Sequence, residues 1–131
     1  MIIKSKSIGK RLPVSALKAR LVANAVKGMK AEKALGYLEY IPNKSAKFIS
    51  KIISSAISNL TSKVEGAYKI DEEKLYVENI LVDKGPIRSM RRARTRTRYK
   101  KKKFRAPLCK RSSCHISVFV QGEQEETKRK K

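Results

Sequence analysis

Apolar residues recur at helical spacing near the start of the chain. Between Ala16 and Val26 they lie three or four positions apart, at Leu17, Leu21, Val22, Ala25 and Val26. This spacing predicts a helix that buries the side these residues share. Ser15 precedes the stretch as a suitable N-cap and Gly28 follows it as a suitable stop, which supports both ends of the predicted helix.

Two more helices are predicted before the middle of the chain. The first runs from about Ala31 to Tyr40 and ends at Pro42, which cannot continue a helix. Its buried side consists of Ala34, Leu35, Leu38 and Ile41. The second runs from Lys44 to about Ser62 and shows the most regular pattern in the chain. Its apolar residues are Ala46, Phe48, Ile49, Ile52, Ile53, Ala56, Ile57 and Leu60.

Alternating apolar and polar residues predict three strands. A short, lysine-rich strand spans Ile2 to Ile8, and two further strands cover residues 75–82 and 116–121. The last two flank a long insertion, so we expect an antiparallel ribbon whose far end is that insertion. The polar residues 122–131 form a tail for which we expect no fixed structure.

Charge adds the strongest functional signal. The chain has 131 residues, which suits a single domain, and carries 33 Lys and Arg against 11 Asp and Glu, for a net charge of +22. A compact protein with this charge repels itself unless a polyanion neutralises it. Nucleic acid is the first candidate partner, and an anionic membrane surface is the second.

The basic residues are concentrated in the insertion between the last two strands. There is no acidic residue from Lys84 to Gln121, and 12 basic residues lie between Gly85 and Lys110. The alternation of arginine and threonine from Arg94 to Arg98 would place the guanidinium groups on one face of a strand, where they could bind phosphates. A disordered cationic loop explains the same composition, so the residues alone leave both interpretations open.

Other classes of protein have little support. No apolar run reaches the roughly 18–20 residues that span a bilayer, and the N-terminus lacks the order of a signal peptide, so we expect a cytosolic protein. Cys109, Cys114 and His115 are too few for a structural zinc site, which takes four ligands. We find no nucleophile paired with a base and no phosphate-binding glycine loop, and we therefore expect no catalytic residue, metal or cofactor.

Several motifs together resemble the universal L-twenty-two family of large-subunit ribosomal proteins, in its bacterial or organellar size class. Residues 15–22, SALKARLV, resemble the first-helix motif S-P-R-K-A-R-L-V, and residues 26–30, VKGMK, resemble the stretch that ends that helix. Residues 55–60, SAISNL, are similar to S-A-x-x-N-A of the third helix. Residues 82–86, VDKGP, and 110–120, KRSSCHISVFV, resemble the two arms of the family's long loop.

The resemblance implies an α+β fold, with three helices packed on a small three-stranded antiparallel sheet and a long, protruding, basic β-hairpin. It implies a single domain over residues 1–121, with the hairpin at about 84–111 and the tail at 122–131. It further implies a non-catalytic constituent of the large subunit of cytoplasmic ribosomes, which binds large-subunit ribosomal RNA and assists assembly. The hairpin would line the nascent-peptide exit tunnel.

The implied partners are ribosomal RNA, neighbouring ribosomal proteins and the nascent peptide near the hairpin tip, with no membrane and no homo-oligomer. By position, the RNA-binding residues would be Lys18, Arg20, Lys27, Lys30, Lys84, Arg88, Arg91, Arg92, Arg94, Arg96, Arg98, Lys110, Arg111, Ser112 and His115. Ser112 and Ser113 could equally pair with the sheet backbone. A nucleic-acid chaperone that binds through charge alone is the alternative function.

Overall fold

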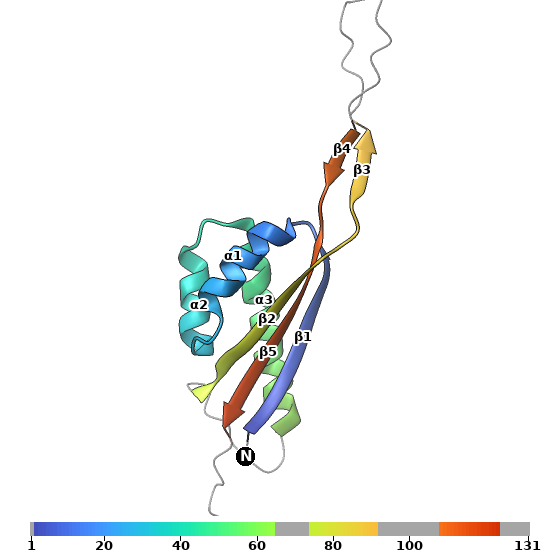
Figure 1. The fold of residues 1–131 in the computed structure, drawn as a ribbon. Helices are drawn as coiled ribbons and strands as arrows, with labels where there is room; N and C mark the ends of the chain where they lie inside the picture. The colour runs from blue at the N-terminus through green and yellow to red at the C-terminus, as the bar shows by residue number, and fades with distance from the viewer. Residues whose placement is uncertain (1, 65–73, 92–107, 124–131) are drawn as a thin grey trace, which may run out of the picture.

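The described part of the chain contains three helices and five strands, and Figure 1 shows their arrangement. The computed structural model describes residues 2–64, 74–91 and 108–123. The elements in chain order are β1 (Ile2–Leu12), α1 (Ala16–Val26), α2 (Ala31–Tyr40), α3 (Lys44–Val64), β2 (Tyr76–Lys84), β3 (Arg88–Arg91), β4 (Leu108–Arg111) and β5 (Cys114–Glu123). A three-stranded antiparallel sheet has the order β1-β5-β2, and β3 pairs with β4 in a separate two-stranded ribbon. The α+β fold class is confirmed.

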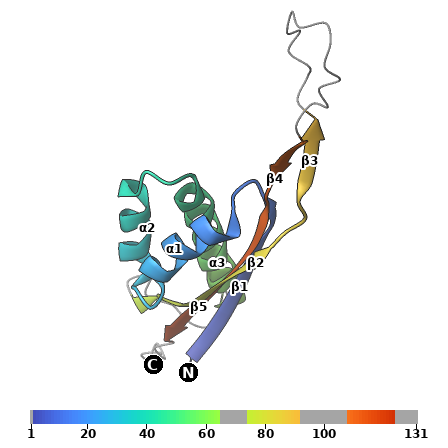
Figure 2. The ribbon, with the colours of Figure 1, turned by 45° about the horizontal axis from the view of Figure 1, so that its top comes forward.

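The three helices cover one face of the three-stranded sheet, and the opposite face, called the bare face, is covered by no helix or strand of the described residues (Figure 2). The central strand β5 shows why, because Cys114, Ile116, Val118 and Val120 alternate with less buried residues and are all fully buried. Successive side chains of a strand point to opposite faces, so this alternation directs one row toward the helices. The core therefore lies between the helices and the β5 row.

The longest helix, α3, supplies the largest buried side chains. Ile49, Ile53 and Leu60 are 0% exposed and follow one another at spacings of four and seven positions, as the sequence pattern predicts. In α2, the predicted side is also buried, with Ala34 and Leu38 inside the core and Leu35 packed against it. The predicted bounds of α2 are confirmed, and α3 extends two residues beyond the predicted end at Ser62.

The buried side of α1 agrees with the prediction at Val22 and Val26, which are buried, and differs from it at two leucines. The helix spans Ala16–Val26 as expected, but Leu17 and Leu21 are 67% and 73% exposed. The face that meets the sheet instead carries the small residues Ala19 and Ala23. Small side chains allow α1 to lie close to β2, and this close packing turns the two leucines toward solvent.

The predicted strands are all present, and all three end later than expected. β2 ends at Lys84, two residues beyond the predicted end at residue 82. β1 continues past Ile8 to Leu12 through a bulge, where Gly9 pairs with Ile116 and Leu12 with Cys114. Arg11 in this bulge has a φ of 55°, a backbone conformation that non-glycine residues seldom adopt. The last strand, β5, includes Gly122 and Glu123, so it ends two residues beyond the predicted end at residue 121.

Side chains of α3 bond to β1, which forms one edge of the sheet. Asn59 Nδ2 donates to the carbonyl oxygen of Lys6 at 3.2 Å, and Lys63 Nζ donates to that of Lys4 at 3.3 Å. Deeper in the same interface, the buried Ser5 hydroxyl donates to the carbonyl oxygen of Ala56 at 2.6 Å. The helix therefore satisfies backbone acceptors of an edge strand as well as covering the core.

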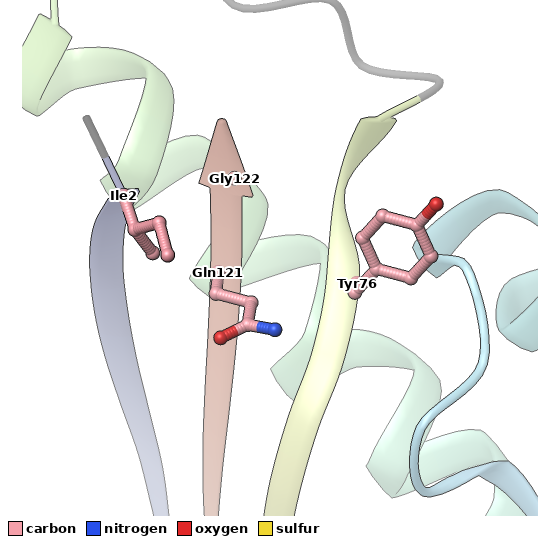
Figure 3. A pocket seen from close by; sticks show the side chains of 4 residues that line it. All are labelled: Ile2, Tyr76, Gln121 and Gly122. Carbon is pink, nitrogen blue, oxygen red and sulfur yellow. The ribbon is translucent and has the colours of Figure 1, made fainter. Parts of the chain in front are cut away.

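The bare face of the sheet carries apolar and polar side chains together. Ile8 and Leu81 lie opposite Ser117 on either side of β5, and they are 47% and 46% exposed. A small hollow at the end of this face is lined by Ile2, Tyr76, Gln121 and Gly122 (Figure 3). Its lining holds no charged side chain, and we assign it no ligand.

Candidate nucleic-acid interface

Four exposed cations gather where the sheet passes into the two-stranded ribbon. Lys84 ends β2, Arg88 begins β3, and Lys110 and Arg111 end β4. Within the described residues, none of the four has an ion-pair partner. Arg88 lies directly opposite Arg111 in the antiparallel register. Like charges at such positions destabilise a strand pair, so this ribbon is suited to a partner that supplies negative charge.

A second cationic group lies at the other end of the sheet. Lys27 follows α1 and Lys30 precedes α2, and both side chains are exposed. The link between them is bonded to β2, since the Gly28 N–H donates to the Val77 carbonyl oxygen at 2.8 Å. Val77 is near the start of β2 and Lys84 is at its end, roughly 23 Å apart at about 3.3 Å per residue. The predicted RNA-binding lysines therefore form two separate groups.

Lys18 and Arg20, both on α1, have different surroundings. Lys18 is exposed and has no hydrogen bond or ion pair in the described part of the chain. The guanidinium of Arg20 donates through Nε and Nη2 to the carbonyl oxygen of Val82, at 3.1 and 2.9 Å. Arg20 thus ties α1 to β2, a bond that the sequence pattern did not indicate.

We expect Arg20→Lys to lower the free energy of unfolding by about 1–2 kcal/mol, because lysine keeps the charge but cannot form the forked contact. Lys18→Gln should leave unfolding unchanged and weaken RNA binding. Chemical denaturation and RNA titration of both variants measure the two effects. An unchanged stability of Arg20→Lys, together with weakened RNA binding, would make Arg20 an RNA contact instead.

His115 also bonds within the protein. Its Nδ1 accepts a hydrogen bond from the backbone N–H of Arg11 at 3.0 Å, which holds the bulge of β1 against β5. The neutral ring then carries its proton on Nε2, and this group could donate to a phosphate. Ser112 is exposed beside the ribbon. The predicted RNA roles of His115 and Ser112 stay predictions.

The bulge of β1 contains two exposed basic residues that were not among the predicted RNA-binding residues. Lys10 and Arg11 are exposed, and they lie beside His115 at the same end of the sheet as Lys84. They were missed because β1 was expected to end at Ile8. The adjacent pair of basic residues before Leu12 was the available signal.

Part of the predicted interface lies outside the described residues. Arg91 belongs to β3, opposite Leu108. The predicted contacts Arg92, Arg94, Arg96 and Arg98, and the hairpin tip, fall in residues 92–107, which are not described. Their assignment remains a prediction.

Groups suited to catalysis or metal binding are scarce in the described ranges. No three His, Cys, Asp or Glu side chains come together there as a metal site. Cys114 is fully buried at the start of β5, and burial raises the pKa of its thiol, so the group stays neutral. No helix in these ranges is both long and apolar enough to cross a membrane.

Fold and site together describe a small basic α+β protein with two groups of exposed cations, a class suited to binding a polyanion. Residues 7–121 match the family described as Ribosomal protein L22p/L17e, and the chain belongs to that family. Family membership makes it a structural constituent of the large subunit of cytoplasmic ribosomes, and not an enzyme.

Several bacterial proteins are similar in sequence to this chain over nearly its whole length. A large ribosomal subunit protein uL22 from Desulforamulus reducens is 37% identical over 123 residues, covering 94% of this chain and 99% of the relative. The protein of the same name from Fusobacterium nucleatum is 39% identical, covering 93% and 100%. That from Campylobacter concisus is 42% identical, covering 88% and 92%.

Proposed function

We propose that the chain binds large-subunit ribosomal RNA through its two cationic groups and its hairpin, and that the hairpin lines the nascent-peptide exit tunnel. The observation that carries the RNA proposal is the pairing of Arg88 with Arg111, two like charges placed opposite each other with no acidic partner in the described residues. Such a ribbon is stabilised when phosphates lie along it.

The arrangement of the ribbon supports the tunnel proposal. It extends away from the helices and the sheet (Figure 1), and its described side chains, Arg88, Lys110 and Arg111, are exposed. An element that projects outward with exposed cations is suited to reach into a larger particle. Membership in a family of large-subunit proteins makes the ribosome that particle, with the nascent peptide as the partner proposed near the hairpin tip.

The two cationic groups support a role in assembly. They lie at opposite ends of one sheet, so a single rigid body can hold two RNA segments at once. Two linked contacts bind more tightly than either alone, because the second contact forms at high effective concentration.

Replacing residues 88–111 by an Asn-Gly turn tests the proposal. We expect the variant to fold, because all core residues of the described part of the chain lie outside this segment, but to associate poorly with the large subunit. The measurement is sedimentation of a cell lysate in about 1 M salt, where the Debye length is about 3 Å, followed by immunodetection. The unmodified chain is the control and should sediment with the subunit. A variant that sediments with the subunit as completely as the control contradicts the proposal.

A further inference from the structure

The chain crosses between the sheet and the ribbon through a short neck of unequal arms. On one side, residues 85–87 connect β2 to β3, and on the other, residues 112 and 113 connect β4 to β5. Because one arm has an extra residue, the ribbon cannot simply continue the register of the sheet, and the two sheets are separate. The direction of the ribbon therefore depends on what holds the neck.

Two hydrogen bonds cross the neck. The Gly85 N–H donates to the carbonyl oxygen of Ser113 at 2.9 Å, and the Ser113 hydroxyl donates to the carbonyl oxygen of Pro86 at 2.7 Å. Ser113 thus holds consecutive residues of the opposite arm, one through its backbone and one through its side chain. Pro86 adds stiffness because its ring fixes φ.

Gly85 is required by the closeness of this contact. A Cβ atom at position 85 would lie 2.5 Å from Ser113 Oγ and 3.1 Å from the Ser113 carbonyl carbon. Both distances are too short for an ordinary contact, and the second involves backbone that cannot rotate away. A larger residue would therefore displace the Ser113 hydroxyl, which bonds Pro86, and press against the Ser113 backbone.

We propose that Gly85 and Ser113 form a neck clip that sets the direction of the hairpin relative to the body before RNA binds. The proposal rests on the proposed function, in which the hairpin and the body cations bind RNA together. A two-stranded ribbon on a loose neck would sample many directions, and ordering it on binding would cost free energy. The clip reduces that cost, so Gly85 and Ser113 are positioning residues that need not touch RNA.

Ser113→Ala tests the clip in the full-length free protein. The change removes the hydroxyl bond to Pro86 and leaves the backbone bond from Gly85 in place. Ser117→Ala is the matched control, because Ser117 is a serine of β5 outside the neck and the proposed RNA interface, and it forms no side-chain hydrogen bond in the described part of the chain. Gly85→Ala is a second variant that opens the clip from the other arm.

The direct readout is the orientation of the ribbon, measured by NMR residual dipolar couplings of backbone amides. In the unmodified chain and in Ser117→Ala, amides of β3 and β4 should fit the same alignment tensor as those of β2 and β5. In Ser113→Ala and Gly85→Ala the ribbon couplings should shrink and depart from that tensor, while the sheet couplings stay unchanged. Affinity for large-subunit RNA should fall about fivefold in Ser113→Ala, the value of one ordinary hydrogen bond.

Ribbon couplings that fit the tensor of the sheet in Ser113→Ala, as in the control, would overturn the clip. The outcome is separable from that of the proposed function. If the Asn-Gly replacement abolishes subunit association while Ser113→Ala retains full RNA affinity and orientation, the clip fails and the function stands. If the replacement associates normally, the function fails, and the couplings still decide whether the clip orients the ribbon.

Discussion

Replacing Lys84, Arg88, Lys110 and Arg111 together by glutamine will make RNA binding much less dependent on salt. Each cation that neutralises a phosphate releases counterions and adds about −0.7 to −0.9 to the slope of log K against log salt. Losing four such contacts should flatten that slope by about 3–4. Titration of a large-subunit RNA fragment between roughly 0.05 and 0.2 M salt covers the range in which such slopes are measured.

A matched variant separates position from total charge. Lys33, Lys44, Lys47 and Lys51 are exposed helix lysines, and changing them to glutamine removes the same charge from the body. We expect this control to keep nearly the slope of the unmodified chain. If both variants flatten the slope equally, the chain binds through net charge alone, and the alternative of a general nucleic-acid chaperone becomes the better account.

Ile53→Ala will lower the free energy of unfolding by about 2–5 kcal/mol, the largest stability effect that we expect from a single substitution. Ile53 is 0% exposed in the middle of α3, within the core beneath the sheet. Truncation removes buried methyl groups and leaves a cavity that the packed neighbours cannot fill. Urea denaturation followed by circular dichroism measures the change.

Leu21→Ala is the control for this prediction. Leu21 is 73% exposed on α1, so its loss should change stability by less than about 0.5 kcal/mol, even though the sequence pattern places it on the buried side. Equal effects of the two substitutions would contradict the assignment of the core. The pair therefore also tests how α1 is rotated against the sheet.

The sequence predicted elements better than it predicted their contacts. In α3 the apolar side chains are large and regularly spaced, so only one face could be buried. In α1 two neighbouring faces compete, one with Leu17 and Leu21 and the other with Ala19 and Ala23. The periodicity of apolar residues predicts that the leucines are buried, whereas the close packing of α1 on β2 buries the alanines. This packing depends on tertiary structure and cannot be derived from the helix sequence alone.

In the candidate site, too, the location of the residues could be predicted from the sequence but their contacts could not. The absence of acids from Lys84 to Gln121 is visible in the sequence, and it correctly indicates where exposed cations gather. Contacts between distant residues are not visible there. The forked bond of Arg20 to Val82 joins residues 62 positions apart, and the bond of Arg11 to His115 joins residues 104 apart. No local pattern encodes such pairs.

The edge of β1 has a consequence for the chain before it joins the large ribosomal subunit. Newly synthesised copies coexist in the cell, and a free strand edge invites another chain to add a strand, which begins aggregation. Asn59 and Lys63 already occupy the carbonyl oxygens of Lys6 and Lys4 on that edge. A second copy would have to displace both side chains to pair there. The helix α3 therefore hinders strand pairing between copies of the protein that have not yet assembled into a ribosome.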